Sequence, residues 1–241
     1  MKSKKWMLDS VLARTAAVAV VSMGLAGAVH AEEAADDGIP GEFSATVGLY
    51  SEYVFRGISY SDEDPSIQGG LTWSHETGIY AGFWGTNGEF GTGGSLELDY
   101  FIGYGNEVNG VSYDISVTYY TYPGDEVDGN YFEFMGKLGY DLGLAAISGG
   151  IAYTPSGQDA FAGEDAFYFF SDLEVPIPNT PFTAAFHVGY TDIKGGSYVD
   201  YSAGLYASVA GLDLGVVFID TDIKAFDPAD SRVVFSISKS F

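Results

Sequence analysis

Cysteine is absent from this chain of 241 residues, and basic residues are few, with ten Lys and Arg against 33 Asp and Glu. Without cysteine there are no disulfides, thiolate zinc sites or cysteine nucleophiles. The net charge of −23 makes the polyanionic backbone of nucleic acid a poor partner. Histidine is also rare, at three residues. No apolar run is long enough to form a transmembrane helix.

The residues that are present favour β-structure. Apolar residues make up 46% and aromatic residues 16% of the chain, which is unlike an acidic disordered tail. The 33 glycines are roughly twice the ordinary share, and they occur together with many Tyr and Phe residues. The length fits one domain, or two small ones.

The first 31 residues are typical of a secretory signal peptide. Lys2, Lys4 and Lys5 precede a weakly apolar run over residues 15–29, and residues 28–31 (AVHA) have the small-x-small form of a cleavage site. We expect cleavage after Ala31. The alternative, an uncleaved membrane anchor, is disfavoured because the run is shorter than the roughly 20 residues that span a bilayer. Residues 32–42 are an acidic, non-periodic lead-in, and we treat residues 43–241 as one domain.

Strict alternation of apolar and polar residues begins at Phe43. A period of two predicts strands with one apolar face. Twelve such runs, separated by turn residues, cover residues 43–55, 67–73, 79–83, 96–104, 111–119, 132–140, 145–153, 167–175, 182–190, 199–209, 212–218 and 233–241.

The connections between these runs alternate between short and long. We expect long polar segments at residues 57–65, 87–95, 123–130, 155–164, 192–196 and 220–231, with tight links between them. Short turns on one rim and long loops on the other are typical of outer-membrane barrels. The predicted fold class is therefore all-β, a transmembrane antiparallel β-barrel of about 12 strands with both termini periplasmic.

A soluble barrel would place its apolar face inward, so the content of the two faces decides between the alternatives. The apolar face carries one charge, Lys239, and its aromatics gather at strand ends, among them Tyr53, Phe55 and Trp73. Such a face in water would favour aggregation, whereas lipid requires it. The polar face then lines the interior, and its candidate pore-lining residues are Glu52, Arg56, Glu97, Asp99, Asp114, Glu133, Lys137, Asp172, Glu174, His187, Asp200 and Asp213, with Arg232 in the last run.

The C-terminus resembles the signal by which outer-membrane barrels are recognised for assembly. It ends in a free Phe241, preceded at alternate positions by Val233, Phe235 and Ile237, while Lys239 departs from the usual apolar residue. The alternative is an edge strand that ends in Phe by chance.

Several stretches resemble the TorF family of proteobacterial outer-membrane porins. They are residues 45–59 (ATVGLYSEYVFRGIS), 65–70 (PSIQGG), 78–87 (GIYAGFWGTN) and 96–99 (LELD), together with the SKSF ending. Thr86 stands where the family pattern has Ser before the Asn. The resemblance implies an outer-membrane location and a porin-like role, and it brings no substrate and no binding or catalytic residues.

The sequence gives little support for an enzymatic function. After removal of the signal peptide only His75, in an expected turn, and His187, on the interior face, remain as imidazole bases. We expect His187 to bond a neighbouring acid such as Asp172. The acidic loops match no EF-hand pattern, and we read them as solvated, so no metal or cofactor is predicted.

Two functions remain. The first is a passive channel for small solutes or ions, with a preference for cations because the interior acids outnumber the bases. The alternative is a plugged, non-conducting barrel whose acidic surface loops bind cations or a partner. The expected partners are outer-membrane lipid, the barrel assembly machinery and small solutes or cations. An enzyme is the least supported class, and the sequence leaves the oligomeric state open.

Overall fold

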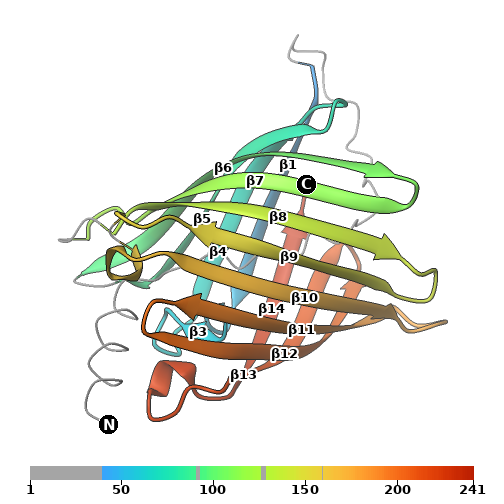
Figure 1. The fold of residues 1–241 in the computed structure, drawn as a ribbon. Helices are drawn as coiled ribbons and strands as arrows, with labels where there is room; N and C mark the ends of the chain where they lie inside the picture. The colour runs from blue at the N-terminus through green and yellow to red at the C-terminus, as the bar shows by residue number, and fades with distance from the viewer. Residues whose placement is uncertain (1–39, 91–92, 126–128, 159) are drawn as a thin grey trace.

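The computed structural model describes residues 40–90, 93–125, 129–158 and 160–241. These residues form a closed barrel of twelve antiparallel strands (Figure 1), as the alternation predicts. The expected signal peptide and most of the lead-in lie outside the described residues. The barrel strands are β1 (Glu42–Tyr50), β4 (Ser66–Ser74), β5 (Ile79–Phe90), β6 (Gly94–Val108), β7 (Val111–Thr121), β8 (Tyr131–Asp141), β9 (Ala146–Thr154), β10 (Ala166–Pro176), β11 (Phe182–Ile193), β12 (Gly196–Val209), β13 (Leu212–Thr221) and β14 (Arg232–Ser240).

Each strand pairs with its neighbours along the chain, and the first strand closes the ring. β1 pairs with β4 on one edge, where Phe43 faces Trp73, and with β14 on the other, where Thr46 faces Ser240. Closure matters because an open sheet in hydrocarbon would leave backbone groups without hydrogen bonds. Among the described residues, none lies in a helix with the length and apolar character needed to cross a membrane.

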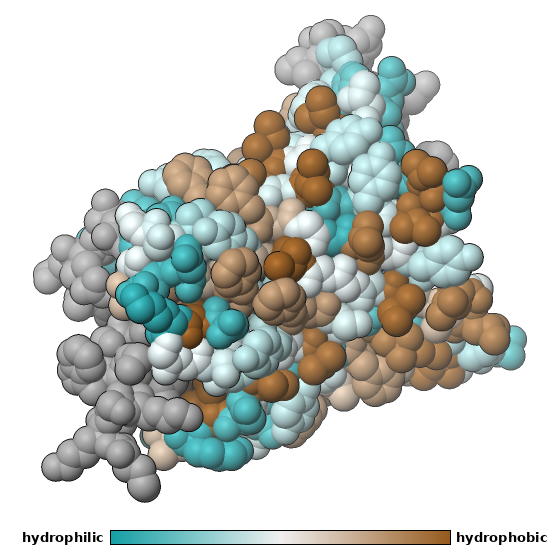
Figure 2. Space-filling model, in the orientation of Figure 1, coloured by the Kyte–Doolittle hydropathy of each residue, from teal (hydrophilic) through white to brown (hydrophobic). Residues whose placement is uncertain are grey.

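The outer face of the barrel is apolar. Large side chains of the predicted lipid face are well exposed on it, including Ile67, Ile115 and Phe235, each at 60%. Figure 2 shows apolar and aromatic side chains over the wall, with hydrophilic ones gathered toward the rims. This arrangement is what a barrel needs when lipid surrounds it.

The two rims differ as the sequence predicts, with one correction. One rim carries short turns such as Asn109-Gly110, where positive φ angles of 55° and 80° make a tight hairpin. The connections from β1 to β4, β7 to β8, β9 to β10 and β13 to β14 are long, and they start from the other rim. Two expected long loops are short, because β5 continues to Phe90 before β6 starts at Gly94, and β11 and β12 are separated only by Lys194-Gly195.

The connection between β1 and β4 enters the barrel. β1 ends at Tyr50, and residues 51–65, which we call the plug segment, form a small hairpin of β2 (Val54–Phe55) and β3 (Ile58–Ser59). Tyr60 N–H donates to the Tyr53 carbonyl at 2.9 Å and fixes the base of this hairpin. The first strand is therefore shorter than predicted. The placement of Tyr53 and Phe55 on the lipid face is wrong, since they are 0% and 7% exposed.

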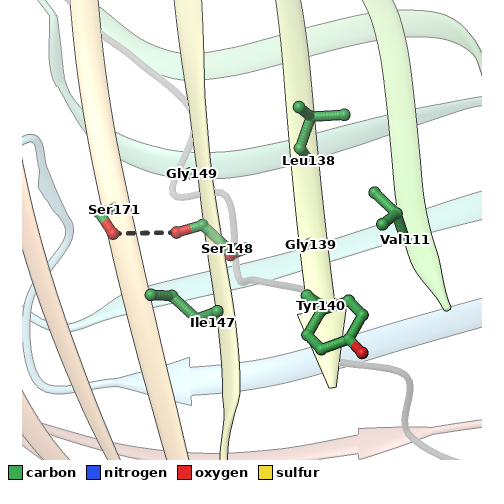
Figure 3. Close-up of a pocket in the computed structure, with 8 residues that line it drawn as sticks. All are labelled: Val111, Leu138, Gly139, Tyr140, Ile147, Ser148, Gly149 and Ser171. Atoms are coloured by element: carbon green, nitrogen blue, oxygen red, sulfur yellow. Dashed lines mark hydrogen bonds between the residues drawn. The ribbon is translucent and has the colours of Figure 1, made fainter. Parts of the chain in front are cut away.

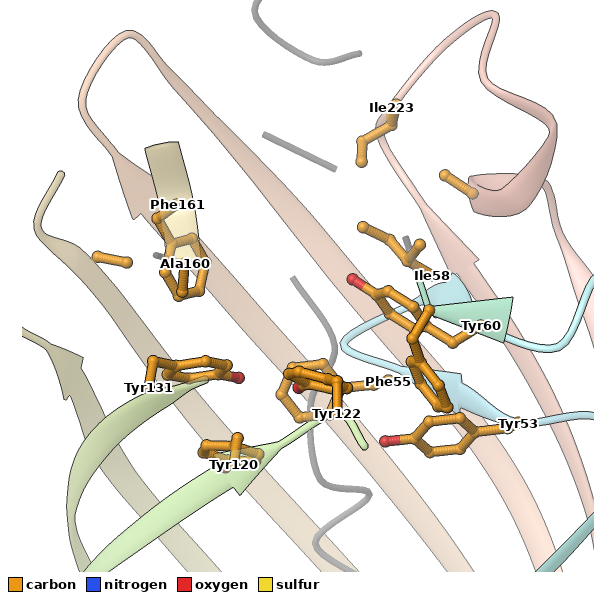
Figure 4. Close-up of a cluster of buried hydrophobic side chains, with 13 residues drawn as sticks. Tyr53, Phe55, Ile58, Tyr60, Tyr120, Tyr122, Tyr131, Ala160, Phe161 and Ile223 are labelled. Atoms are coloured by element: carbon orange, nitrogen blue, oxygen red, sulfur yellow. The ribbon is translucent and has the colours of Figure 1, made fainter. Parts of the chain in front are cut away.

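The plug segment packs into an aromatic core at the long-loop end (Figure 4). The wall and the loops both contribute, the latter through the short 3-10 turns η1 (Ala160–Gly163) and η2 (Asp227–Ala229). The cluster consists of Tyr53, Phe55, Ile58, Tyr60, Phe90, Tyr120, Tyr122, Tyr131, Ala160, Phe161, Ala166, Ile223 and Ala229. Tyr120 and Tyr131 stack with ring centroids 4.4 Å apart. This core closes the long-loop half of the barrel around the plug segment.

Candidate functional site

The tip of the plug segment is bound to the far wall by Arg56. Its guanidinium donates to both carboxylate oxygens of Glu133 on β8, at 2.8 and 2.9 Å. It also lies 4.1 Å above the ring of Tyr168 on β10. Bidentate pairing and stacking of this kind make full use of the planar guanidinium. β8 and β10 lie across the barrel from β1 and β4, so the segment spans the lumen.

Both carboxylate oxygens of Glu133 accept a further hydrogen bond besides those from Arg56. The Tyr120 hydroxyl donates to Glu133 at 3.2 Å and the Thr154 hydroxyl at 3.3 Å. Both partners of the ion pair are buried, with side chains 8% and 6% exposed. A buried charge deprived of its partner is costly, so each side chain depends on the other.

A second buried ion pair fastens the start of the plug segment. Glu52 accepts from Arg232 at the beginning of β14. Arg232 also donates to the carbonyl oxygens of Asp227 and Asp230, at 3.1 and 3.0 Å, which connects the plug to η2. Glu52 and Arg56 thus lie inside the barrel, on an inserted loop instead of the predicted strand.

The close approach at the plug tip requires a glycine. Gly57 has a φ of +79°, and a Cβ atom there would lie 2.3 Å from Thr221 Cγ2 and 2.8 Å from Asp200 Cβ. Thr221 and Asp200 belong to β13 and β12. The tip therefore lies directly against the wall at β12 and β13, which are three and two strands from β1 around the barrel.

Two acids on β6 lie in the plugged half and have no counter-charge in contact. Glu97 and Asp99 are both 0% exposed. Glu97 Oε1 accepts from the Tyr122 hydroxyl at 3.3 Å, but Glu97 Oε2 and both oxygens of Asp99 have no hydrogen-bond partner. The sequence places them on the interior face, and the plug segment accounts for their complete burial.

His187 connects three strands below the plug tip. Its Nδ1 lies 2.7 Å from Asp172 Oδ1, so the predicted contact is present. Its Nε2 lies 2.7 Å from the Tyr168 hydroxyl and 3.2 Å from Asp200 Oδ1. Because Arg56 stacks on the same Tyr168, this network joins the plug tip to the lower interior.

The half of the interior next to the short turns is more open and carries the remaining candidates. Lys137 Nζ approaches Asp172 at 3.9 Å. Asp114 and Lys137 face each other in register, but they form no ion pair, and Asp114 accepts from the Tyr80 hydroxyl at 2.8 Å. Glu174 and Asp213 lie toward the rim, where the Ser208 hydroxyl donates to Asp213.

The interior keeps a negative excess after these pairings. Each permanent interior cation contacts one acid, in the pairs Arg56–Glu133, Arg232–Glu52 and Lys137–Asp172. Six candidate acids lie outside these three pairs: Glu97, Asp99, Asp114, Glu174, Asp200 and Asp213. A mobile cation in the lumen would meet a favourable potential.

The surface loops offer less chemistry. Asp165 accepts from the Ser156 backbone N–H and the Tyr153 hydroxyl, both at 2.9 Å, and these bonds lower the pKa of its carboxyl. The described part of the chain contains no group of three or more His, Cys, Asp or Glu side chains arranged around a common metal position.

A shallow depression lies on the outer wall, lined by Leu138, Tyr140, Ile147, Gly149 and their neighbours (Figure 3). Gly149 pairs with Leu138 on one side and Ser171 on the other, and its missing side chain creates the depression. Its large side chains belong to the lipid-facing set. We attribute the depression to the lipid-facing surface and assign it no ligand.

The tyrosines around the plug are the functional side chains that the sequence reasoning missed. Tyr120, Tyr131 and Tyr168 occupy the interior phase of their strands. Large aromatics on a face that should line an open pore are the signal that could have revealed a filled lumen.

A closed antiparallel barrel with an apolar outer wall and a charged interior has the architecture of outer-membrane barrels of the porin type. The chain belongs to the family described as "Bacterial protein of unknown function (Gcw_chp)", whose model matches residues 33–241. The narrower TorF resemblance is not confirmed by this match. No curated protein matches the sequence.

Solved porins share the fold at low sequence identity. The KdgM porin aligns with a TM-score of 0.58 and 7% identity, over 82% of this chain and 99% of its own. The NanC porin aligns with a TM-score of 0.53 and 10% identity, over 82% of this chain and 98% of its own. At such identities the likeness concerns the fold alone.

Proposed function

We propose that this protein is a porin-like channel of the bacterial outer membrane that passes small solutes or ions, prefers cations, and has its lumen closed by the plug segment in the conformation described. The observation that carries this proposal is the closed barrel whose interior keeps six acids outside its three ion pairs. The fold shared with KdgM and NanC supports it. Export through the signal peptide and contact with outer-membrane lipid and the assembly machinery belong to the same proposal.

A second function is favoured by the plug segment itself. Two buried ion pairs and an aromatic core hold it across the lumen, which suits a permanently closed barrel. In that case the acidic loops would carry the activity, by binding cations or a partner at the cell surface.

Conductance in planar bilayers distinguishes the two functions. The protein is compared with a variant in which residues 54–61 are replaced by a Gly-Ser linker of equal length, so that β1 and β4 stay connected. A channel with a closing plug should give rare or small conductance steps in the unmodified protein and large, steady ones in the linker variant. If a folded linker variant inserts and carries no current, the channel proposal is wrong and the second function stands.

A further inference from the structure

The buried acids on β6 carry an inference beyond transport. Glu97 and Asp99 have the same orientation on one strand, and both side chains are fully buried. Three of their four oxygens lack a hydrogen-bond partner. Proteins rarely bury carboxylates this way, because an uncompensated charge in a low-dielectric interior must be paired, neutralised or bound to a metal.

No basic side chain of the described chain contacts these acids. The nearby Arg56 uses its guanidinium on Glu133. The charged side chains that act electrostatically on Asp99 are Glu97 and Glu133, and both are acids. Compensation by a protein cation is therefore missing at this position.

A third oxygen from another segment points to the same place. The Tyr53 hydroxyl belongs to the plug segment, is 0% exposed, and faces Glu97 without making a hydrogen bond of normal geometry. It interacts electrostatically with both Glu97 and Asp99. Gln68 on β4 also has a buried amide oxygen without a hydrogen-bond partner. Gln68 pairs in register with Thr86 on β5, and Thr86 pairs in register with Glu97 on β6.

We propose that Glu97, Asp99 and Tyr53 bind a hard divalent cation of the Ca²⁺ type. Such cations take oxygen ligands from carboxylates, amide carbonyls and water, with flexible geometry that a site of two carboxylates can satisfy when water completes the shell. The dianionic pair matches the charge of the ion. Because Tyr53 belongs to the plug segment and the acids belong to β6, the cation would join the plug to the wall at a second point, two strands away from the Arg56 contact on β8.

Terbium luminescence tests this site in the full-length protein folded in detergent. Tb³⁺ binds oxygen sites as Ca²⁺ does, and the tyrosines around Glu97 would sensitise its emission. The chelator-treated protein should show one saturable site that Ca²⁺ displaces. Glu97→Gln with Asp99→Asn should weaken this binding by at least about tenfold. Asp165→Asn, which alters an exposed acid bonded to a tyrosine, should leave it unchanged and serves as the control.

Thermal unfolding gives a second readout that does not depend on luminescence. Ca²⁺ should raise the Tm of the chelator-treated protein and leave the Tm of the folded double variant unchanged. Should the double variant fail to fold, Tyr53→Phe alone is expected to weaken Tb³⁺ binding. Absence of a saturable signal, its persistence in the folded double variant, or a Tm that responds to Na⁺ or K⁺ and not to Ca²⁺ would overturn the proposal. Binding is measured without current, so its failure and that of the channel proposal are distinguishable.

Discussion

Arg56 determines, at the scale of single residues, whether the plug segment stays across the lumen. It pairs with Glu133 through two hydrogen bonds and stacks on Tyr168. Removal of one partner from a buried ion pair typically costs about 3 to 5 kcal/mol, because the other charge stays buried without compensation.

We therefore expect Arg56→Ala to release the plug tip while the barrel stays folded. The variant should conduct more often than the unmodified protein in planar bilayers, and protease should cut within residues 51–65. Lys194→Ala is the matched control, because it removes a cation from an exposed ion pair with Glu164 worth at most about 1 kcal/mol. Equal behaviour of the two variants would show that Arg56 does not hold the plug.

The sequence does not predict the inward position of Tyr53 and Phe55. Tyr53 and Phe55 continue the alternation of β1 beyond Tyr50, so the local pattern alone assigns them to the lipid face. Contacts of the plug segment with distant residues turn them inward. Arg56 pairs with Glu133, 77 positions away, and Glu52 pairs with Arg232, 180 positions away. A period-two pattern holds no information about such partners.

Individual strands were more predictable because their signals are local. Polar and apolar positions alternate and turn residues follow, so all twelve barrel strands could be located from the sequence. The predicted ends of β5, β6 and β11 are too early and the predicted starts of β6 and β12 are too late, since these strands extend through polar residues that resemble a loop.

The two faces of a strand should respond oppositely to a new charge. Val117→Arg places a cation in the lipid near the middle of β7, and we expect a cost of about 2 to 4 kcal/mol in the free energy of unfolding. Leu98→Arg on β6 should behave alike. Thr118→Arg, one residue further on, faces the interior opposite Glu133 and should cost far less. Folding titrations into lipid vesicles measure the difference, and equal costs would show that the strands are phased wrongly.

The last strand should depend on its terminal residue. Phe241 exchanges two backbone hydrogen bonds with Ala45, at 2.9 and 3.2 Å, which extend the pairing of β14 with β1. We expect deletion of Phe241 to reduce the heat-modifiable, protease-resistant band in outer-membrane fractions. Leu144→Ala, in an exposed short turn, should leave that band unchanged. An undiminished band after the deletion would remove the role assigned to the terminus, including the proposed signal at Val233, Phe235 and Ile237.

The N-terminal segment has its own test. Lys2, Lys4, Lys5 and the sequence AVHA predict cleavage after Ala31. N-terminal sequencing of membrane-purified protein should begin at Glu32. A start at Met1 would contradict export through a cleaved signal.

For the molecule as a whole, the acid excess predicts ion selectivity. In the linker variant that lacks the plug tip, the reversal potential under a KCl gradient should favour K⁺, because the interior keeps more acids than bases. Electrostatic screening reaches about 8 Å at physiological salt, so selectivity should weaken at high salt if the opened lumen is wide. Replacing Asp114 and Asp213 with Asn should reduce it further, whereas Asp165→Asn should not. A preference for chloride would contradict the assigned interior face.

The wide sequence separation between the plug contacts has a consequence for the order of folding. The plug segment lies near the beginning of the chain, yet its fastening points lie on β8, at Glu133, and at the first residue of β14. Contacts between such distant residues form slowly, because long loops must close first. We therefore expect the segment to become fixed late, with its Glu52 contact completed only when β14 is in place. On this order, closure of the barrel and fixation of the plug would both depend on β14, so a chain that stalls before β14 would have neither a sealed wall nor a fixed plug.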